Sequence, residues 1–168
     1  RAERKADASF RALRAEACRT RLAFGPKSWG AWAGGMEEAR EASLRSPQTR
    51  DAWAALACAD FRAHGFAKNF EAAGLLFPGE AWFDGARFAK DAWFNQTSFQ
   101  GEASFRHTEF TADALFEGAR FAHEAKFDAL HAKDSMQMRG AFFAGAVRAV
   151  GARFDGDVWA VGARFQAG

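Results

Sequence analysis

The chain has 168 residues, of which 49% are apolar and 15% aromatic, with 19 Phe, 6 Trp and no Tyr. This composition excludes a disordered tail, which contains few aromatic residues. The 23 Lys and Arg residues nearly balance the 21 Asp and Glu residues, which excludes a polybasic nucleic-acid-binding arm. No apolar run approaches the roughly 18–20 residues of a membrane-spanning helix, so we expect no transmembrane segment.

Cysteine content and the first residue indicate in which cellular compartment the protein is expected. Cys18 and Cys58 are too few for a disulfide scaffold and favour a reducing compartment. Because the chain starts with Arg1 rather than Met, we expect a processed product or a fragment. A processed organelle form or an exported form therefore stays open.

Residues 1–58 are predicted to form a helical and loop region that caps the rest of the chain. A helix is expected over residues 2–23, with its apolar side at Ala6, Phe10, Leu13 and Ala17. Positions 1–21 contain seven basic and three acidic residues. This helix therefore either packs on the chain's own core or contacts an acidic partner or a membrane surface peripherally.

Glycine and proline predict a loop over residues 25–35, which carries Trp29 and Trp32, and a short helix is expected at 36–45. Residues 46–63 favour a further helix, because Ser46 can cap it and Pro47 suits its first turn. Some apolar residues of the segment 59–80 continue the spacing of the repeat that follows. This segment forms either a degenerate first coil or a packed cap.

Residues 81–168 contain a repeat in which Phe recurs at alternating steps of five and six residues, usually with Ala or Thr two positions earlier. Its most regular members are Phe83, Phe88, Phe94, Phe99, Phe105, Phe110, Phe116, Phe121 and Phe127. An 11-residue period on a helix scatters these side chains around the whole cylinder. On short strands, the small residue and the Phe share one face. A chain that turns after each strand winds into a four-sided coil of two 11-residue units.

The inward positions of this coil conserve volume. Where Phe is absent, the residue two positions earlier is often larger, as in Leu130 before Ala132 and Val147 before Ala149. A close-packed interior demands this compensation. All Phe residues from Phe83 onward except Phe142 occupy inward positions, so most of the phenylalanine content reflects architecture.

The Ala/Thr–x–Phe pairs resemble the A-(D/N)-(L/F)-x-x motif of the pentapeptide-repeat family, and they cover about half of the chain. The resemblance implies a mainly β fold, a right-handed quadrilateral β-helix of about four to five coils with about 22 residues each. The alternating steps depart from the strict five-residue step of the family. We therefore expect an extra residue at alternate corners, as in a bulge.

The sequence contains no recognisable catalytic, cofactor-binding or metal-binding residues. Its four histidines lack metal-ligand spacing. A nucleophile elbow, a phosphate loop and a dinucleotide fingerprint are also absent. The candidate partner surface instead consists of large apolar residues outside the inward positions. These are Trp82, Trp93, Leu115, Phe142, Trp29 and Trp32. Such residues mark either a partner site or cap packing.

These features predict a non-catalytic protein–protein interaction scaffold, which includes a peripheral structural subunit of a larger assembly. The family resemblance implies one alternative, a DNA mimic that binds a type II topoisomerase. That mechanism needs a strongly anionic rod, whereas residues 81–168 carry 10 basic and 11 acidic residues. A second alternative is a ligand-binding or enzymatic N-terminal region with the solenoid as an oligomerisation rod.

Overall fold

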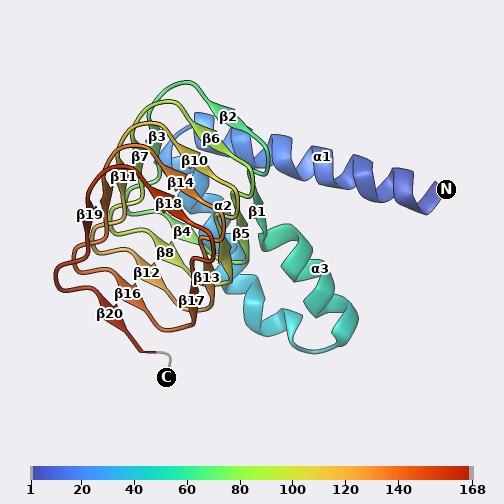
Figure 1. Ribbon diagram of the computed structural model, residues 1–168. Coiled ribbons are helices and arrows are strands. Elements are labelled where there is room, and N and C mark those ends of the chain that lie inside the picture. The colour runs from blue at the N-terminus through green and yellow to red at the C-terminus, as the bar shows by residue number, and fades with distance from the viewer. Residues whose placement is uncertain (1, 167–168) are drawn as a thin grey trace.

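Three helices precede a four-sided β-solenoid (Figure 1). The computed structural model describes residues 2–166, with side chains from residue 7 onward. The helices are α1 (Ala2–Ala23), α2 (Pro26–Ser43) and α3 (Pro47–Ala57). Two-residue strands then follow one another around the coil, and each pairs in parallel with a strand 22 residues away, as β1 does with β5. The prediction of a mainly β solenoid behind a helical segment is confirmed.

The strands form four parallel sheets of five strands, one along each wall. The β1 sheet contains β1 (Ala59–Asp60), β5 (Ala81–Trp82), β9 (Ala103–Ser104), β13 (Ala125–Lys126) and β17 (Val147–Arg148). The β2 sheet contains β2 (Gly65–Phe66), β6 (Arg87–Phe88), β10 (Glu109–Phe110), β14 (His131–Ala132) and β18 (Arg153–Phe154). The β3 sheet contains β3 (Phe70–Glu71), β7 (Ala92–Trp93), β11 (Ala114–Leu115), β15 (Met136–Gln137) and β19 (Val158–Trp159). The β4 sheet contains β4 (Leu76–Phe77), β8 (Ser98–Phe99), β12 (Arg120–Phe121), β16 (Phe142–Phe143) and β20 (Arg164–Phe165). Residues 59–80 thus form a coil with strands on all four walls.

The five-residue and six-residue steps correspond to two kinds of corner. At the five-residue corners the Ala86 N–H donates to the Phe83 carbonyl at 2.9 Å, and Gly85 has a φ of 67°. A β-turn with a left-handed third residue has this geometry. The left-handed position recurs every 11 residues, at Ala63, Gly74, Gly85, Gln96, His107, Gly118, Ala129, Gly140, Gly151 and Gly162. The extra residue of the six-residue steps lies at the other corners, which contain no such position among the described residues.

Helix α2 shows that the predicted loop at 25–35 and the separate helix at 36–45 are wrong. One helix runs from Pro26 to Ser43 and includes Gly30. A glycine within a helix costs about 1 kcal/mol. Burial of Trp29 and Ala33 against the first coil offsets this cost. Tertiary packing therefore overrides the weak local helix preference of this segment.

Helix α3 starts and ends within the predicted range of 46–63. Ser46 accepts a hydrogen bond from the Thr49 N–H at 3.1 Å, and the Thr49 hydroxyl accepts one from the Ser46 N–H. This capping box fixes the first turn, and Pro47 occupies the first helical position. The helix ends at Ala57, so Phe61 belongs to the first coil rather than to the helix.

Helix α1 contacts the first coil through a different side than the one predicted. Cys18 is buried and Leu22 packs against the core, whereas Phe10 and Leu13 are 43% and 66% exposed. Ala6 lies outside the described side chains. Figure 1 shows that the N-terminal half of α1 extends beyond the solenoid. The predicted apolar side therefore has little core to cover.

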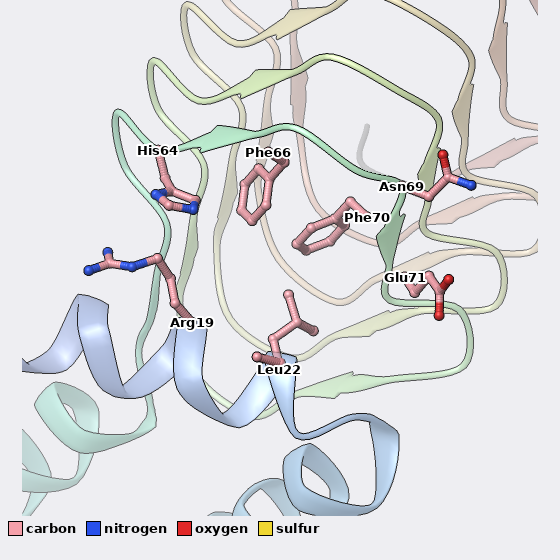
Figure 2. A pocket seen from close by; sticks show the side chains of 8 residues that line it. Arg19, Leu22, His64, Phe66, Asn69, Phe70 and Glu71 are labelled. Atoms are coloured by element: carbon pink, nitrogen blue, oxygen red, sulfur yellow. The ribbon is translucent and has the colours of Figure 1, made fainter.

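The helices cover only part of the first coil. Helix α1 packs against β1, and α2 packs against β4. The corner between β2 and β3 stays open beside the end of α1, where a pocket forms (Figure 2). Among the described residues, no helix is long and apolar enough to cross a membrane.

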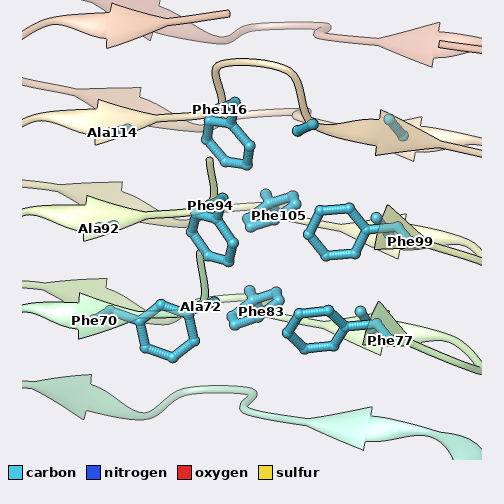
Figure 3. Close-up of a cluster of buried hydrophobic side chains, with 14 of the residues drawn as sticks. Phe70, Ala72, Phe77, Phe83, Ala92, Phe94, Phe99, Phe105, Ala114 and Phe116 are labelled. Atoms are coloured by element: carbon cyan, nitrogen blue, oxygen red, sulfur yellow. The ribbon is translucent and has the colours of Figure 1, made fainter. Parts of the chain in front are cut away.

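The core consists of columns of stacked phenylalanine rings (Figure 3). Phe83 and Phe105 stack with centroids 4.9 Å apart and planes within 2°, and Phe94 and Phe116 stack at 4.7 Å. Neighbouring columns meet edge to face, as Phe83 and Phe94 do at 5.4 Å. Offset stacking and edge contacts are both favourable for aromatic rings. The regular phenylalanine spacing is therefore the sequence signature of these columns.

Candidate interaction surfaces

The outward residues of the strands form one vertical row on each wall. Pairing places Leu115 next to Trp93 on the β3 sheet. Trp82 lies on the β1 sheet, on the opposite wall, and Phe142 lies on the β4 sheet. Trp29 and Trp32 belong to α2. The six predicted surface residues are thus divided among three walls and the helical cap.

The β3 sheet carries the largest row of outward apolar side chains. We call this row the Trp93 wall, and it consists of Trp93, Leu115, Gln137 and Trp159. Register places each member beside the next, with Gln137 between Leu115 and Trp159. Trp93 and Leu115 are half-buried by their neighbours, and Trp159 is 43% exposed. Trp93 and Leu115 are adjacent and Gln137 separates them from Trp159, so the row is a mostly apolar strip on the solenoid.

Trp159 was absent from the predicted surface, although the sequence contains its signal. It lies between Val158 and Ala160, which follow the inward residues Val147 and Ala149 by one 11-residue unit, so its side chain must point outward. It also follows Trp93 by three coils in the same row. Counting outward positions at the 22-residue period would have found it.

Acidic residues border one edge of the Trp93 wall. Asp91, Asp113 and Asp157 each immediately precede a strand of the β3 sheet, with Ser135 at the intervening position. The Ser135 hydroxyl donates to the Asp113 carboxylate at 2.7 Å. The strip therefore has a row of carboxylates along one side.

The other edge of the Trp93 wall carries mixed charge. Arg139 lies 3.7 Å from the Glu117 carboxylate, and its guanidinium lies 5.1 Å from the Trp159 ring centroid. A cation over an indole ring holds both side chains in place. Trp159 is thus partly ordered before any partner binds.

Trp82 packs against the helical cap. The Arg14 and Arg62 guanidiniums lie 5.0 Å and 4.4 Å from its ring centroid. Both arginines also donate to the Asp60 carboxylate, at 3.2 Å from Arg14 and 2.7 Å from Arg62. Burial opposes ionisation of Asp60, but hydrogen bonds from Arg62 and Arg14 outweigh it and hold the pKa of Asp60 below its ordinary value. This cluster joins α1 to the first coil.

Trp29 and Trp32 also belong to the cap. Trp29 is fully buried, and its indole N–H donates to the Leu76 carbonyl at 2.8 Å. Trp32 is half-buried beneath the Arg21 guanidinium, 4.9 Å from the ring centroid. Trp29 therefore contributes no surface to a partner in this structure.

Phe142 is isolated from the other candidate residues. It is half-buried on the β4 sheet, with the Arg120 guanidinium 5.3 Å from its ring centroid. Its neighbours in the outward row are Arg120 and Arg164. A single ring between two arginines does not extend into an apolar strip.

Among the described side chains of α1, three of the four basic residues are engaged within the chain. Arg11 pairs with Asp7 at 2.7 Å, Arg14 pairs with Asp60, and Arg21 lies over Trp32. Surface pairs such as Arg11 with Asp7 contribute little stability. They nevertheless reduce the positive charge that α1 offers to an acidic surface.

The fold brings Cys18 and Cys58 together at the junction of α1 and the first coil. The Cys18 thiol donates to the Cys58 carbonyl at 3.7 Å, and both residues are buried. Burial raises the pKa of both thiols, which disfavours the reactive thiolate. Over the described residues, no group of three or more His, Cys, Asp or Glu side chains is placed to hold a metal ion.

Residues 83–130 match the family model described as pentapeptide repeats (9 copies). Searches of curated proteins and of solved structures gave no significant match. The matched segment begins at Phe83 in the second coil, ends in the fourth coil and contains β6 to β13. The four-sided coil and its inward phenylalanines fit this family, and the match itself covers residues 83–130.

Proposed function

We propose that the chain is a non-catalytic interaction scaffold that binds a protein partner through the Trp93 wall. The observation that carries this proposal is the row of Trp93, Leu115 and Trp159 on the β3 sheet, in which Gln137 separates Leu115 from Trp159. Aromatic residues dominate the binding energy of many interfaces. A rigid solenoid also presents such a row with little entropic cost on binding.

The acidic border defines the chemistry of the partner. Asp91, Asp113 and Asp157 lie along one edge of the wall. A complementary partner would bring apolar side chains to the strip and lysine or arginine to this edge. Such charges would speed association and make it sensitive to salt. A peripheral structural subunit of a larger assembly would meet this description.

A substitution at Trp159 tests the proposal with little risk to the fold. The affinity-tagged chain would be purified from its native cells, and its complexes would be separated by size-exclusion chromatography. Trp159→Ser removes a partly exposed ring at the end of the row, and Val150→Ser is a matched control because Val150 is 72% exposed outside this row. We expect Trp159→Ser to weaken the complex at least tenfold and Val150→Ser to leave it unchanged.

The expected complex also has a defined salt response. Because carboxylates border the strip, its association rate should fall as salt is raised from about 0.05 to 0.5 M. A strictly monomeric chain, or a complex that is equally stable with Trp159→Ser and with Val150→Ser, would contradict the proposal.

A further inference from the structure

A pocket of about 380 Å³ lies where the helical cap leaves the first coil uncovered (Figure 2). Leu22, Phe66 and Phe70 give it an apolar interior. Arg19 and His64 lie together at one side, and Asn69 and Glu71 lie at the other. Its size falls within the range of about 300–1,000 Å³ that is usual for small-molecule sites. It shares no residue with the Trp93 wall but adjoins it, because Glu71 of the pocket pairs with Trp93.

The pocket exposes the first ring of a phenylalanine column. Phe88 is fully buried because it stacks on Phe110 at 4.8 Å on one side and on Phe66 at 4.8 Å on the other. Phe66 is only half-buried, and among the described residues no further ring stacks on its second face. His64 and Phe70 instead meet it edge to face, at 4.6 Å and 4.7 Å. Phe61 also contacts this ring, tilted at 5.8 Å, so the column ends at Phe66 with one face that carries no stacked ring.

The cap itself indicates what fits such a face. Trp29 stacks on Phe61 at 6.0 Å with planes 23° apart, and it packs against Phe77 at 5.0 Å. The ends of two neighbouring columns are thus covered by one aromatic ring from α2. The Phe66 column lacks this cover. A planar aromatic group is the occupant that would continue it.

The charge at one side of the pocket favours an anion. Arg19 forms no ion pair with any carboxylate among residues 7–166. His64 lies beside it, and burial together with the Arg19 charge lowers the pKa of His64. Glu71 lies at the opposite side, so a single carboxylate is best placed near Arg19 (Figure 2). Arginine binds carboxylates through two parallel hydrogen bonds.

We propose that this pocket binds an aromatic ring that carries a carboxylate, with the ring on Phe66 and the carboxylate at Arg19. A free arylalkanoic acid and a peptide that ends in phenylalanine offer the same chemistry. The pocket is large enough for the phenylpropionate portion of either ligand. The site would make this end of the solenoid a ligand-binding end rather than only a structural cap.

The test uses 3-phenylpropionate, with its neutral amide as the matched control ligand. Binding to the full chain would be measured by isothermal titration calorimetry and by amide chemical shifts in two-dimensional NMR. We expect saturable binding of the acid, with shifts at residues around Phe66, and at least tenfold weaker binding of the amide. N-acetyl-Gly-Gly-Phe with a free carboxylate tests the peptide source. Whichever of the two acids binds more tightly identifies the source.

Two substitutions test the site without removing core contacts. Arg19→Gln should weaken binding about tenfold or more, because a charge-assisted pair is lost. Ala23→Phe should block the pocket, since Ala23 lines it and is exposed. Arg45→Gln is the control, because Arg45 is exposed in the turn after α2. Thermal melts would verify that all three variants fold.

Three outcomes would overturn the proposal. The first is that neither acid shows saturable binding at concentrations up to about 10 mM, tenfold above a millimolar Kd. The second is equal affinity for the acid and the amide. The third is unchanged binding in folded Arg19→Gln or Ala23→Phe.

Discussion

Phe105→Ala is the sharpest test of the columnar core. Phe105 is fully buried, and its ring stacks between Phe83 at 4.9 Å and Phe127 at 5.4 Å. Phe94 and Phe116 contact it edge-on at 5.4 Å. Truncation of a buried Phe to Ala costs about 3–5 kcal/mol. Because rigid neighbouring coils cannot collapse into the cavity, we expect a loss of about 4 kcal/mol.

Phe165→Ala is the matched control at the end of another column. Phe165 is 59% exposed and has one stacking partner, Phe143 at 4.9 Å. A single aromatic pair is worth about 0.5–1.5 kcal/mol, so we expect a loss of about 1 kcal/mol. Urea denaturation followed by circular dichroism would measure both free energies of unfolding, with hydrogen exchange to detect partial unfolding of coils. A cost for Phe105→Ala below about 1.5 kcal/mol, or no larger than that for Phe165→Ala, would refute the reasoning.

Three further changes test the corners and the cap. Ala129→Gly should stabilise the chain by about 0.5–1 kcal/mol, since Ala129 has a left-handed φ of 52°. Gly118→Ala, at the equivalent corner with a φ of 65°, should destabilise the chain by about 1 kcal/mol. Thermal melts would measure both variants, and the reverse sign for either one would contradict the corner geometry. Thr97→Val should cost about 0.5–1.5 kcal/mol in urea denaturation, because the Thr97 hydroxyl donates to the buried Ala72 carbonyl at 2.7 Å, while that carbonyl keeps the bond from the Leu75 N–H at 3.0 Å. A neutral result would show that the hydroxyl bond contributes nothing to stability. The pKa of Asp60 is lowered, so its contribution to stability is complete above its unfolded pKa of about 4 and is lost as the pH falls through its folded pKa. Asp60→Asn should therefore reduce the free energy of unfolding at pH 7 and make that free energy fall less steeply below pH 4. An unchanged dependence of stability on pH in the acid range would contradict this role.

The repeat could be predicted from the sequence because each inward position obeys one simple constraint. A column of rings requires Phe at a fixed spacing, and a close-packed interior requires its partner to grow where Phe is lost. Both rules act locally and repeat along the chain. The structure places Leu130 in the buried core beside Ala132, as this compensation predicts.

The helical cap was less predictable because its contacts are not local. The local sequence around Gly30 favours a loop, and the burial of Trp29 against the first coil stabilises a helix there instead. The packed side of α1 is likewise set by where the coil lies. Leu22 and Cys18 contact it, whereas the apolar pattern favoured Phe10 and Leu13.

Prediction of the candidate surfaces requires both the 22-residue period of the coil and the direction in which each side chain points. The repeat predicts that Trp93 and Leu115 point outward, and strand pairing places Trp159 in the same row. The pocket beside Phe66 had no sequence signal. It depends on the position at which α1 crosses the first coil, which no local pattern in residues 2–23 specifies.

The ring columns also limit where this solenoid can bind anything. Along the walls, inward rings are sealed by the coils above and below, so Phe88 and Phe110 expose no surface. Outward rows supply only one side chain per coil, and function there requires several large groups in one row, as on the β3 sheet. Among the described residues, column rings become accessible at the two ends of the solenoid: at the last coil, where Phe165 is 59% exposed, and beside the incomplete cap, where Phe66 is half-buried next to the pocket. A wall substitution such as Trp159→Ser should therefore leave 3-phenylpropionate binding intact, and Ala23→Phe should leave the wall-dependent complex intact, because the two sites share no residue.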